Sequence, residues 1–323
     1  ARGAMDSLNL SVPLQHDYTD PTVERDEARL RGAGGAVLED EAPAERLQIV
    51  GRAGNGIDNI DIDAATQRGI LVANTPESNT MSAAELAVGL MLAQARNIPQ
   101  ATAHLKNGHW DRNRFKGTEL FGKTLGIIGL GRIGSLVAVR MQAFGMRVIG
   151  YDPYISDERF KRLDVERCER LEELIQASDY LTVHTPKNKE TFHMIHSGHL
   201  PLMKKGVRMA NVARGGIIEE AAIIRGIEEG IIASAGIDVH EQEPSHNTAL
   251  LHHEQVIVTP HLGASTDEAQ LNVGMTVAEQ VIAALEGASV GLLVPLCIPP
   301  LKSFAEFSEK VQLVAVGEEY RLY

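Results

Sequence analysis

The hydrophobic pattern between residues 123 and 260 alternates between two periods. Short apolar runs rich in β-branched residues alternate with helix-length segments. The runs that indicate strands are residues 124–128, 147–151, 180–183, 207–212, 232–237 and 256–259. Strands that are apolar on both faces and alternate with helices are typical of a parallel sheet with helices on each side. The sequence therefore predicts an α/β fold with a doubly wound parallel sheet.

A second, smaller lobe is indicated before this block. Residues 47–50 and 70–73 are strand-like and flank a helical pattern at 61–68. Long helices are predicted over residues 81–95, leading between the lobes, and after the capping box at 265–268, carrying the chain back. The tail around residues 304–314 is helical in pattern. We therefore expect one lobe from residues 1–96 and 288–323, flavodoxin-like and incomplete before residue 37, and a second from residues 97–287.

Composition narrows the class of protein. A chain of 323 residues suits two compact domains, and 31 basic against 43 acidic side chains give a net charge of −12, which disfavours nucleic acid as a partner. No apolar run approaches the ~20 residues that cross a bilayer, so no membrane association is expected. Cys168 and Cys297 form neither a CxxC pair nor a zinc-like spacing, which favours a cytoplasmic protein.

The histidines do not predict a metal site. His193, His196 and His199 are spaced three apart, but Gly198 and Pro201 interrupt any helix that would align them. Zinc also requires further ligands at a fitting geometry. We therefore expect no metal.

The sequence GLGRIG at residues 129–134 directly follows one predicted strand and precedes a helical pattern over 133–144. Gly129 permits a tight turn, Gly131 lets a pyrophosphate approach the backbone, and Gly134 allows close packing of helix on strand. The next predicted strand ends on Asp152, where a carboxylate binds ribose hydroxyls and repels a 2′-phosphate. These glycines could merely make a turn, but the combination favours NAD as the cofactor.

Three polar side chains follow later predicted strands: Arg214, Glu243 and His261. Oxidising an alcohol next to a carboxylate requires a base for the hydroxyl proton, and histidine titrates closest to neutral pH. A glutamate behind the imidazole would fix its tautomer, and an arginine fork would bind the carboxylate. Singly, each could be an ordinary surface or core residue. Their joint placement predicts hydride transfer to or from a small anionic 2-hydroxy acid.

From about Leu47 to Gly287 the chain resembles the D-2-hydroxyacid dehydrogenase family. The resemblance rests on the glycine motif and on the segments VGRAG at 50–54 with DN at 58–59, NTP at 74–76, SAAEL at 82–86, residues 110–117, VHTP at 183–186, ARGG at 213–216 and PHLGA at 260–264. It implies that Arg214, Glu243 and His261 are catalytic. It also implies NAD contacts from Thr75, Arg132, Ile133, Asp152, Thr185, Ala213, Arg214, Asp238, His261, Gly263 and Ala264.

The resemblance implies substrate contacts from Arg52, Gly54 and Asn55, and from Arg112 or Arg114 to a substrate phosphate, although an ordinary solvated loop is equally compatible with these last arginines. It implies a homodimer or a dimer-based tetramer formed through the helix at 81–95. The activity implied is NAD-dependent oxidation of D-3-phosphoglycerate to 3-phosphohydroxypyruvate, which feeds serine biosynthesis. The alternatives are reduction of glyoxylate, hydroxypyruvate or another 2-oxo acid, and, from a different class, an NAD(H)-sensing protein similar to corepressors.

Overall fold

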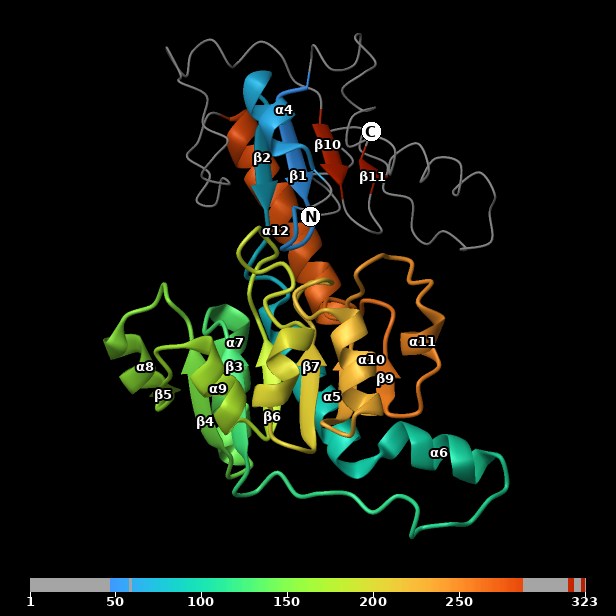
Figure 1. Ribbon diagram of the computed structural model, residues 1–323. Helices are drawn as coiled ribbons and strands as arrows, with labels where there is room; N and C mark the ends of the chain where they lie inside the picture. The colour runs from blue at the N-terminus through green and yellow to red at the C-terminus, as the bar shows by residue number, and fades with distance from the viewer. Residues whose placement is uncertain (1–46, 58–59, 287–312, 317–320, 323) are drawn as a thin grey trace. The chain divides into compact units, whose positions relative to one another are not determined.

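The computed structural model describes residues 47–57 and 60–286 and the backbone of two strands at 313–316 and 321–322 (Figure 1). The chain divides into two compact units. The larger is Thr80–Ser265, and the smaller takes in the described residues before and after it. The unit boundaries thus differ from those expected at 96/97 and 287/288. The expectation of an incomplete lobe before residue 37 lies outside the described residues.

The larger unit contains a seven-stranded sheet in the order β5-β4-β3-β6-β7-β8-β9, with every pair parallel. Its strands are β3 (Thr124–Ile128), β4 (Arg147–Tyr151), β5 (Glu166–Arg167), β6 (Tyr180–Val183), β7 (Val207–Asn211), β8 (Ile232–Ile237) and β9 (Val256–Val258). All but β5 were predicted to within one residue at each end, and the parallel α/β fold is confirmed. The two residues of β5 are polar, so they carry no hydrophobic signal.

Two hydrophobic cores lie on opposite faces of this sheet, because successive strand residues point to opposite sides. In β3, Ile127 belongs to the core that includes helices α5 (Thr80–Arg96) and α7 (Arg132–Ala143). Its neighbour Ile128 belongs to the core that includes α9 (Leu171–Ala177) and α10 (Glu220–Glu228). The remaining helices are α6 (Ile98–Lys106), α8 (Asp157–Leu163), the 3-10 helix η1 (Ser197–Leu202) and α11 (Thr248–Leu251).

The packing of helix α5 explains why the larger unit begins at Thr80 rather than at residue 97. It packs against β7, β8 and α7, and most of its small apolar residues are buried there. A helix predicted to lead between lobes is therefore a core helix of the larger unit.

The smaller unit takes in residues from both sides of the larger one along the chain. Its sheet has the order β11-β10-β1-β2, from β1 (Ile49–Arg52), β2 (Leu71–Asn74), β10 (Leu313–Val316) and β11 (Arg321–Leu322). The two helices are α4 (Ile62–Gln67) and α12 (Asp267–Leu285). A Cβ on Gly51 would lie 2.8 Å from Val277 Cγ2, so this glycine lets α12 pack closely on β1.

Two details of the prediction are wrong. The helical pattern over residues 304–314 fails at Leu313 and Val314, which belong to β10 and pair in parallel with β1; the earlier residues of that pattern lie outside the described ones. The sequence LVAV is a short apolar run whose period does not distinguish helix from strand. The cap of α12 is Thr266, whose hydroxyl accepts the Ala269 N–H at 3.2 Å, rather than Ser265.

Candidate active site

The glycine loop between β3 and α7 combines close packing with an open helix end. Gly129 has a φ of +88°, and a Cβ there would lie 2.7 Å from His184 O. A Cβ on Gly134 would approach Gly129 O to 2.0 Å. Gly131, the N-cap of α7, is exposed, and no atom lies within 4 Å of the position its Cβ would take. The free N–H groups and the helix dipole therefore face a space that an anion can enter.

Two side chains that follow the strands on either side of β3, Asp152 after β4 and Thr185 after β6, fit a dinucleotide beside this loop. Asp152 Oδ2 accepts the Leu130 N–H at 2.9 Å and Oδ1 accepts the Tyr154 N–H at 3.0 Å, which ties the end of β4 to the loop. Each carboxylate oxygen keeps a further lone pair for a ribose hydroxyl. Thr185 Oγ1 is buried without a hydrogen-bond partner among the described residues. Such a hydroxyl is costly to leave unpaired, so a ligand contact there would be favourable.

His261 and Glu243 form a close pair in the loops after β9 and β8. His261 Nδ1 lies 2.7 Å from Glu243 Oε2, and about a third of each side chain is exposed. Burial raises the pKa of Glu243, but hydrogen bonds from His261 and from the His240 backbone N–H together lower it by more than burial raises it. The net pKa of Glu243 is therefore below its ordinary value. An ionised carboxylate can only accept, so Nδ1 carries a proton; in a neutral imidazole the other nitrogen, Nε2, is then the basic one.

Asp238, at the end of β8, holds the backbone around His261. It is fully buried, and its carboxylate accepts the Leu262 N–H at 2.6 Å, the Gly263 N–H at 2.9 Å and the Thr259 hydroxyl at 2.6 Å. Its own carbonyl accepts the His261 N–H at 2.9 Å. His261 has a φ of 56°, a left-handed conformation that a non-glycine residue keeps only when its surroundings enforce it. No local sequence pattern indicates this supporting role.

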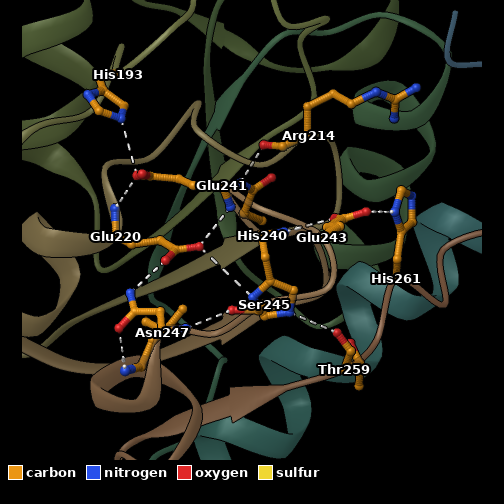
Figure 2. Close-up of polar contacts among 12 residues, drawn as sticks. His193, Arg214, Glu220, His240, Glu241, Glu243, Ser245, Asn247, Thr259 and His261 are labelled. Carbon is orange, nitrogen blue, oxygen red and sulfur yellow. Dashed lines mark hydrogen bonds and ion pairs between the residues drawn. The ribbon is translucent and has the colours of Figure 1, made fainter. Parts of the chain in front are cut away.

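Arg214 follows β7 in a turn shaped by Asn211. The Asn211 amide donates to Arg214 O at 2.9 Å, and its Oδ1 accepts the Ala213 N–H at 3.0 Å. The next residue, Gly215, lies so close to His240 that a Cβ would approach the His240 carbonyl oxygen to 1.6 Å. The loops of Arg214 and Glu243 are thus in backbone contact. Figure 2 shows Arg214, Glu243 and His261 grouped around these loops.

The predicted substrate residues Arg52, Gly54 and Asn55 lie in the smaller unit, at the C-terminal end of β1. Gly54 has a φ of +151°, and a Cβ there would lie 2.8 Å from Arg52 Nη1, so the glycine leaves room for the guanidinium. Thr75, predicted to contact NAD, is 1% exposed, and its hydroxyl accepts the Gly54 N–H at 2.9 Å. The Asn74 amide donates to Asn55 O at 2.8 Å. The loop is therefore held by the end of β2.

The remaining candidates lie in the larger unit. Arg132 and Ile133 begin α7. Arg112 is exposed in residues 107–122, which follow α6, and Arg114 in the same segment forms an ion pair with Glu254. Gly263 is buried and its carbonyl accepts the Ser82 hydroxyl at 2.8 Å.

Of the three histidines spaced three apart, His196 and His199 lie together, with ring centroids 4.2 Å apart, while His193 pairs with a glutamate. His193 Nε2 lies 3.2 Å from Glu241 Oε1, whereas His196 Nδ1 accepts the Gly198 N–H at the start of η1. Within the described ranges, no three His, Cys, Asp or Glu side chains are placed to hold a metal ion.

Cys168 is half-buried, and burial raises its thiol pKa to about 11. Among the described helices, none combines the length and apolar character needed to cross a membrane.

The parallel sheet and its glycine loop define a dinucleotide-binding domain. A sequence profile described as "D-isomer specific 2-hydroxyacid dehydrogenase, NAD binding domain" matches residues 88–263. The chain belongs to this family, as its resemblance indicated, and carries the family's NAD-binding domain. A D-3-phosphoglycerate dehydrogenase from Methanocaldococcus jannaschii is 53% identical over 244 residues, 76% of this chain and 47% of the relative. The chain thus spans about half the length of this curated relative.

Solved structures agree with the assignment. A glyoxylate reductase from Paecilomyes thermophila superimposes with a TM-score of 0.73 at 33% identity, covering 78% of this chain and 76% of that one. A D-lactate dehydrogenase from Aquifex aeolicus, complexed with NAD and lactic acid, has a TM-score of 0.70 at 31% identity, covering 77% and 80%. The fold is therefore shared with enzymes named for different small acids, glyoxylate and D-lactate.

Proposed function

We propose that this chain catalyses the NAD-dependent oxidation of D-3-phosphoglycerate to 3-phosphohydroxypyruvate. The observation that carries the proposal is the 2.7 Å pairing of His261 with Glu243 at the edge of a sheet that also presents the glycine loop. The choice of substrate is supported by the 53% identity to a D-3-phosphoglycerate dehydrogenase.

The reaction needs a base, a carboxylate clamp and a hydride acceptor. His261 Nε2 takes the proton of the C2 hydroxyl, and Glu243 stabilises the imidazolium that forms. Arg214 binds the substrate carboxylate through its guanidinium fork and orients C2. NAD, when bound, supplies the acceptor for the hydride that leaves C2. Proton and hydride together account for the oxidation of the alcohol to the ketone.

The residues proposed to hold NAD begin with those of the glycine loop. Gly131 and the start of α7 would bind the pyrophosphate, Asp152 the ribose hydroxyls, and Thr185 a further polar group. We retain Thr75, Arg132, Ile133, Ala213, Asp238, Gly263 and Ala264 as further NAD contacts. We assign substrate binding to the smaller unit through Arg52, Gly54 and Asn55, with Arg112 as a candidate for the phosphate.

The proposed assembly is a homodimer in the cytoplasm. Helix α5 buries most of its apolar residues within its own unit, so it offers little surface for a partner. By contrast, α6 has no buried residue, and the segment after it exposes Trp110 to 84% and Phe121 to 77%. Large exposed apolar side chains concentrated on one segment favour an interface there. Sedimentation equilibrium of the wild type and of Trp110→Ser would test it, with a monomeric variant as the expected result.

A parallel assay of four oxo acids tests the proposed activity. NADH oxidation is followed by absorbance with 3-phosphohydroxypyruvate, hydroxypyruvate, glyoxylate and 2-oxoglutarate, and NADH binding is followed by fluorescence. We expect a clear preference for the phosphorylated acid. Preference for glyoxylate would instead assign the activity of the structural relative. NADH binding without turnover of any of the four would favour a dinucleotide-sensing protein.

A further inference from the structure

His240 touches all three loops that carry the proposed catalytic residues (Figure 2). It lies two residues after Asp238 and is only 7% exposed. Its carbonyl oxygen lies against Gly215, next to Arg214. Its backbone N–H donates to Glu243 Oε1 at 3.0 Å, and its ring Nε2 lies 3.2 Å from Thr259 O. A buried histidine in this position needs a structural or functional reason, because imidazole is costly to bury.

The hydrogen bond of the ring fixes its tautomer. A carbonyl oxygen can only accept, so His240 Nε2 carries a proton and donates it to Thr259 O. Nδ1 is buried and has no hydrogen-bond partner among the described residues; Glu220 Oε1 lies 4.0 Å away. Glu220 is itself held in place, because its carboxylate accepts the Glu241 N–H at 2.8 Å and the Asn247 amide at 2.6 Å. Among the described residues, the imidazole therefore makes one hydrogen bond, to Thr259 O, and one longer contact, with the Glu220 carboxylate.

Thr259 lies two residues before His261 in the chain. Its N–H donates to Ile237 O at 3.0 Å, and its hydroxyl donates to Asp238. The His240 ring holds the remaining polar group of this residue, its carbonyl. His240 thus holds Glu243 through its backbone N–H, and it holds the backbone before His261 through its side chain.

We propose that His240 is a positioning residue that aligns the His261 imidazole with the Glu243 carboxylate. The inference rests on the proposed function, in which this pair accepts the substrate proton. The His240 ring contacts neither reacting atom; it acts by setting the geometry of the base. Losing its donor would let the Thr259–His261 segment shift, and small displacements of a base can lower the rate by up to about 100-fold.

Three substitutions separate the hydrogen bond from packing. His240→Gln keeps an amide donor that can reach Thr259 O, whereas His240→Met has a similar length and no donor. His240→Phe preserves a planar ring of similar size. We expect kcat to fall about 10- to 100-fold in His240→Met and His240→Phe and to stay within about threefold of wild type in His240→Gln. KM should change less than about threefold in all three, because the Arg214 side chain and the glycine loop are unaltered.

A wild-type kcat in His240→Met and His240→Phe would overturn the inference, as would an equal loss of kcat in His240→Gln. Should His240→Phe not fold, the Met and Gln pair still decides, because the two differ in the donor rather than in length. The matched control is His246→Phe, which replaces an exposed histidine in the same loop and should leave kcat unchanged.

A readout independent of turnover separates this inference from the proposed activity. Solvent exchange of the His261 Nδ1 proton, measured on protein with 15N-labelled histidine, reports the bond to Glu243. We expect faster exchange in His240→Met than in wild type or His240→Gln. Equal exchange in all three would overturn the positioning role, even if no oxo acid is turned over. Absent turnover in the wild type with the expected exchange pattern would instead overturn only the proposed activity.

Discussion

His184 should make the stability of the larger unit depend on pH. It follows β6 next to the glycine loop, and burial lowers its pKa from 6.5 to about 4. Its Nε2 lies 3.1 Å from Thr182 Oγ1, while Nδ1 is buried without a hydrogen-bond partner within the described part of the chain. Burial alone lowers this pKa, so a second proton on the ring would be a buried charge without a compensating partner.

The sign and the size follow from proton linkage. Below pH 6.5 the unfolded chain protonates His184 while the folded chain does not, so the free energy of unfolding decreases as pH falls from 6.5 towards 4. A shift of about 2.5 pKa units corresponds to about 3.4 kcal/mol once the pH is below both values. Between pH 7 and pH 5 the loss is about 2 kcal/mol, and it is still about 1.5 kcal/mol if the folded pKa is 5.

The variant His184→Gln removes this titration. Its free energy of unfolding is measured by urea denaturation at pH 7 and pH 5, followed by circular dichroism, and compared with wild type at the same two pH values. The constant cost of altered packing cancels in the difference between the two pH values. The matched control is His252→Gln, which removes an exposed histidine from the same unit. We expect the loss of stability between pH 7 and pH 5 to shrink by about 2 kcal/mol in His184→Gln. A change below about 1 kcal/mol would refute the reasoning.

Four further predictions concern the proposed catalytic base, the glycine loop, helix α5 and the thiol. His261→Ala should lower kcat by about 10²–10⁴-fold with NADH affinity nearly unchanged, measured by absorbance and fluorescence; wild-type turnover would contradict its role as the base. Gly134→Ala should abolish NADH binding, because its Cβ would meet Gly129 O at 2.0 Å, whereas Gly89→Ala on α5, with open space around it, should raise stability by up to about 1 kcal/mol. Cys168, with a pKa of about 11, should be alkylated at pH 7 at least about 100-fold more slowly than a peptide cysteine when assayed in Cys297→Ser; a similar rate would contradict its burial.

The elements of the fold that could be predicted are those marked by a clear hydrophobic pattern. In the larger unit, β3, β4, β6 and β8 have the predicted bounds, because a buried parallel strand is a short apolar run with clear ends. The failures occurred where that signal is absent or ambiguous. The polar pair forming β5 has no apolar residue to mark it, and the run at β10 fits helix and strand equally until its pairing with β1 is known.

The candidate site likewise has residues that could be predicted from the sequence and residues that could not. The proposed oxidation of a 2-hydroxy acid restricts the residue types that can act, so Arg214, Glu243 and His261 could be proposed from their type and their place after strands. The positioning of these side chains requires only a donor or an acceptor at the right distance, which many residue types supply. Asp238 and His240 reach partners about twenty positions along the chain, and no local pattern marks such contacts.

The contacts of Asp238 and His240 also explain why His261 can sit in a left-handed conformation. Asp238 accepts N–H groups on the residues after His261 and the hydroxyl of Thr259 before it, while His240 binds the Thr259 carbonyl. An unfavourable φ persists only where several bonds oppose relaxation, and here they act on both sides of the residue. The hydrogen bonds of these buried polar groups are therefore what keeps the His261 backbone in its strained conformation. A substitution that removes either support should affect the alignment of His261 with Glu243 before it affects the sheet.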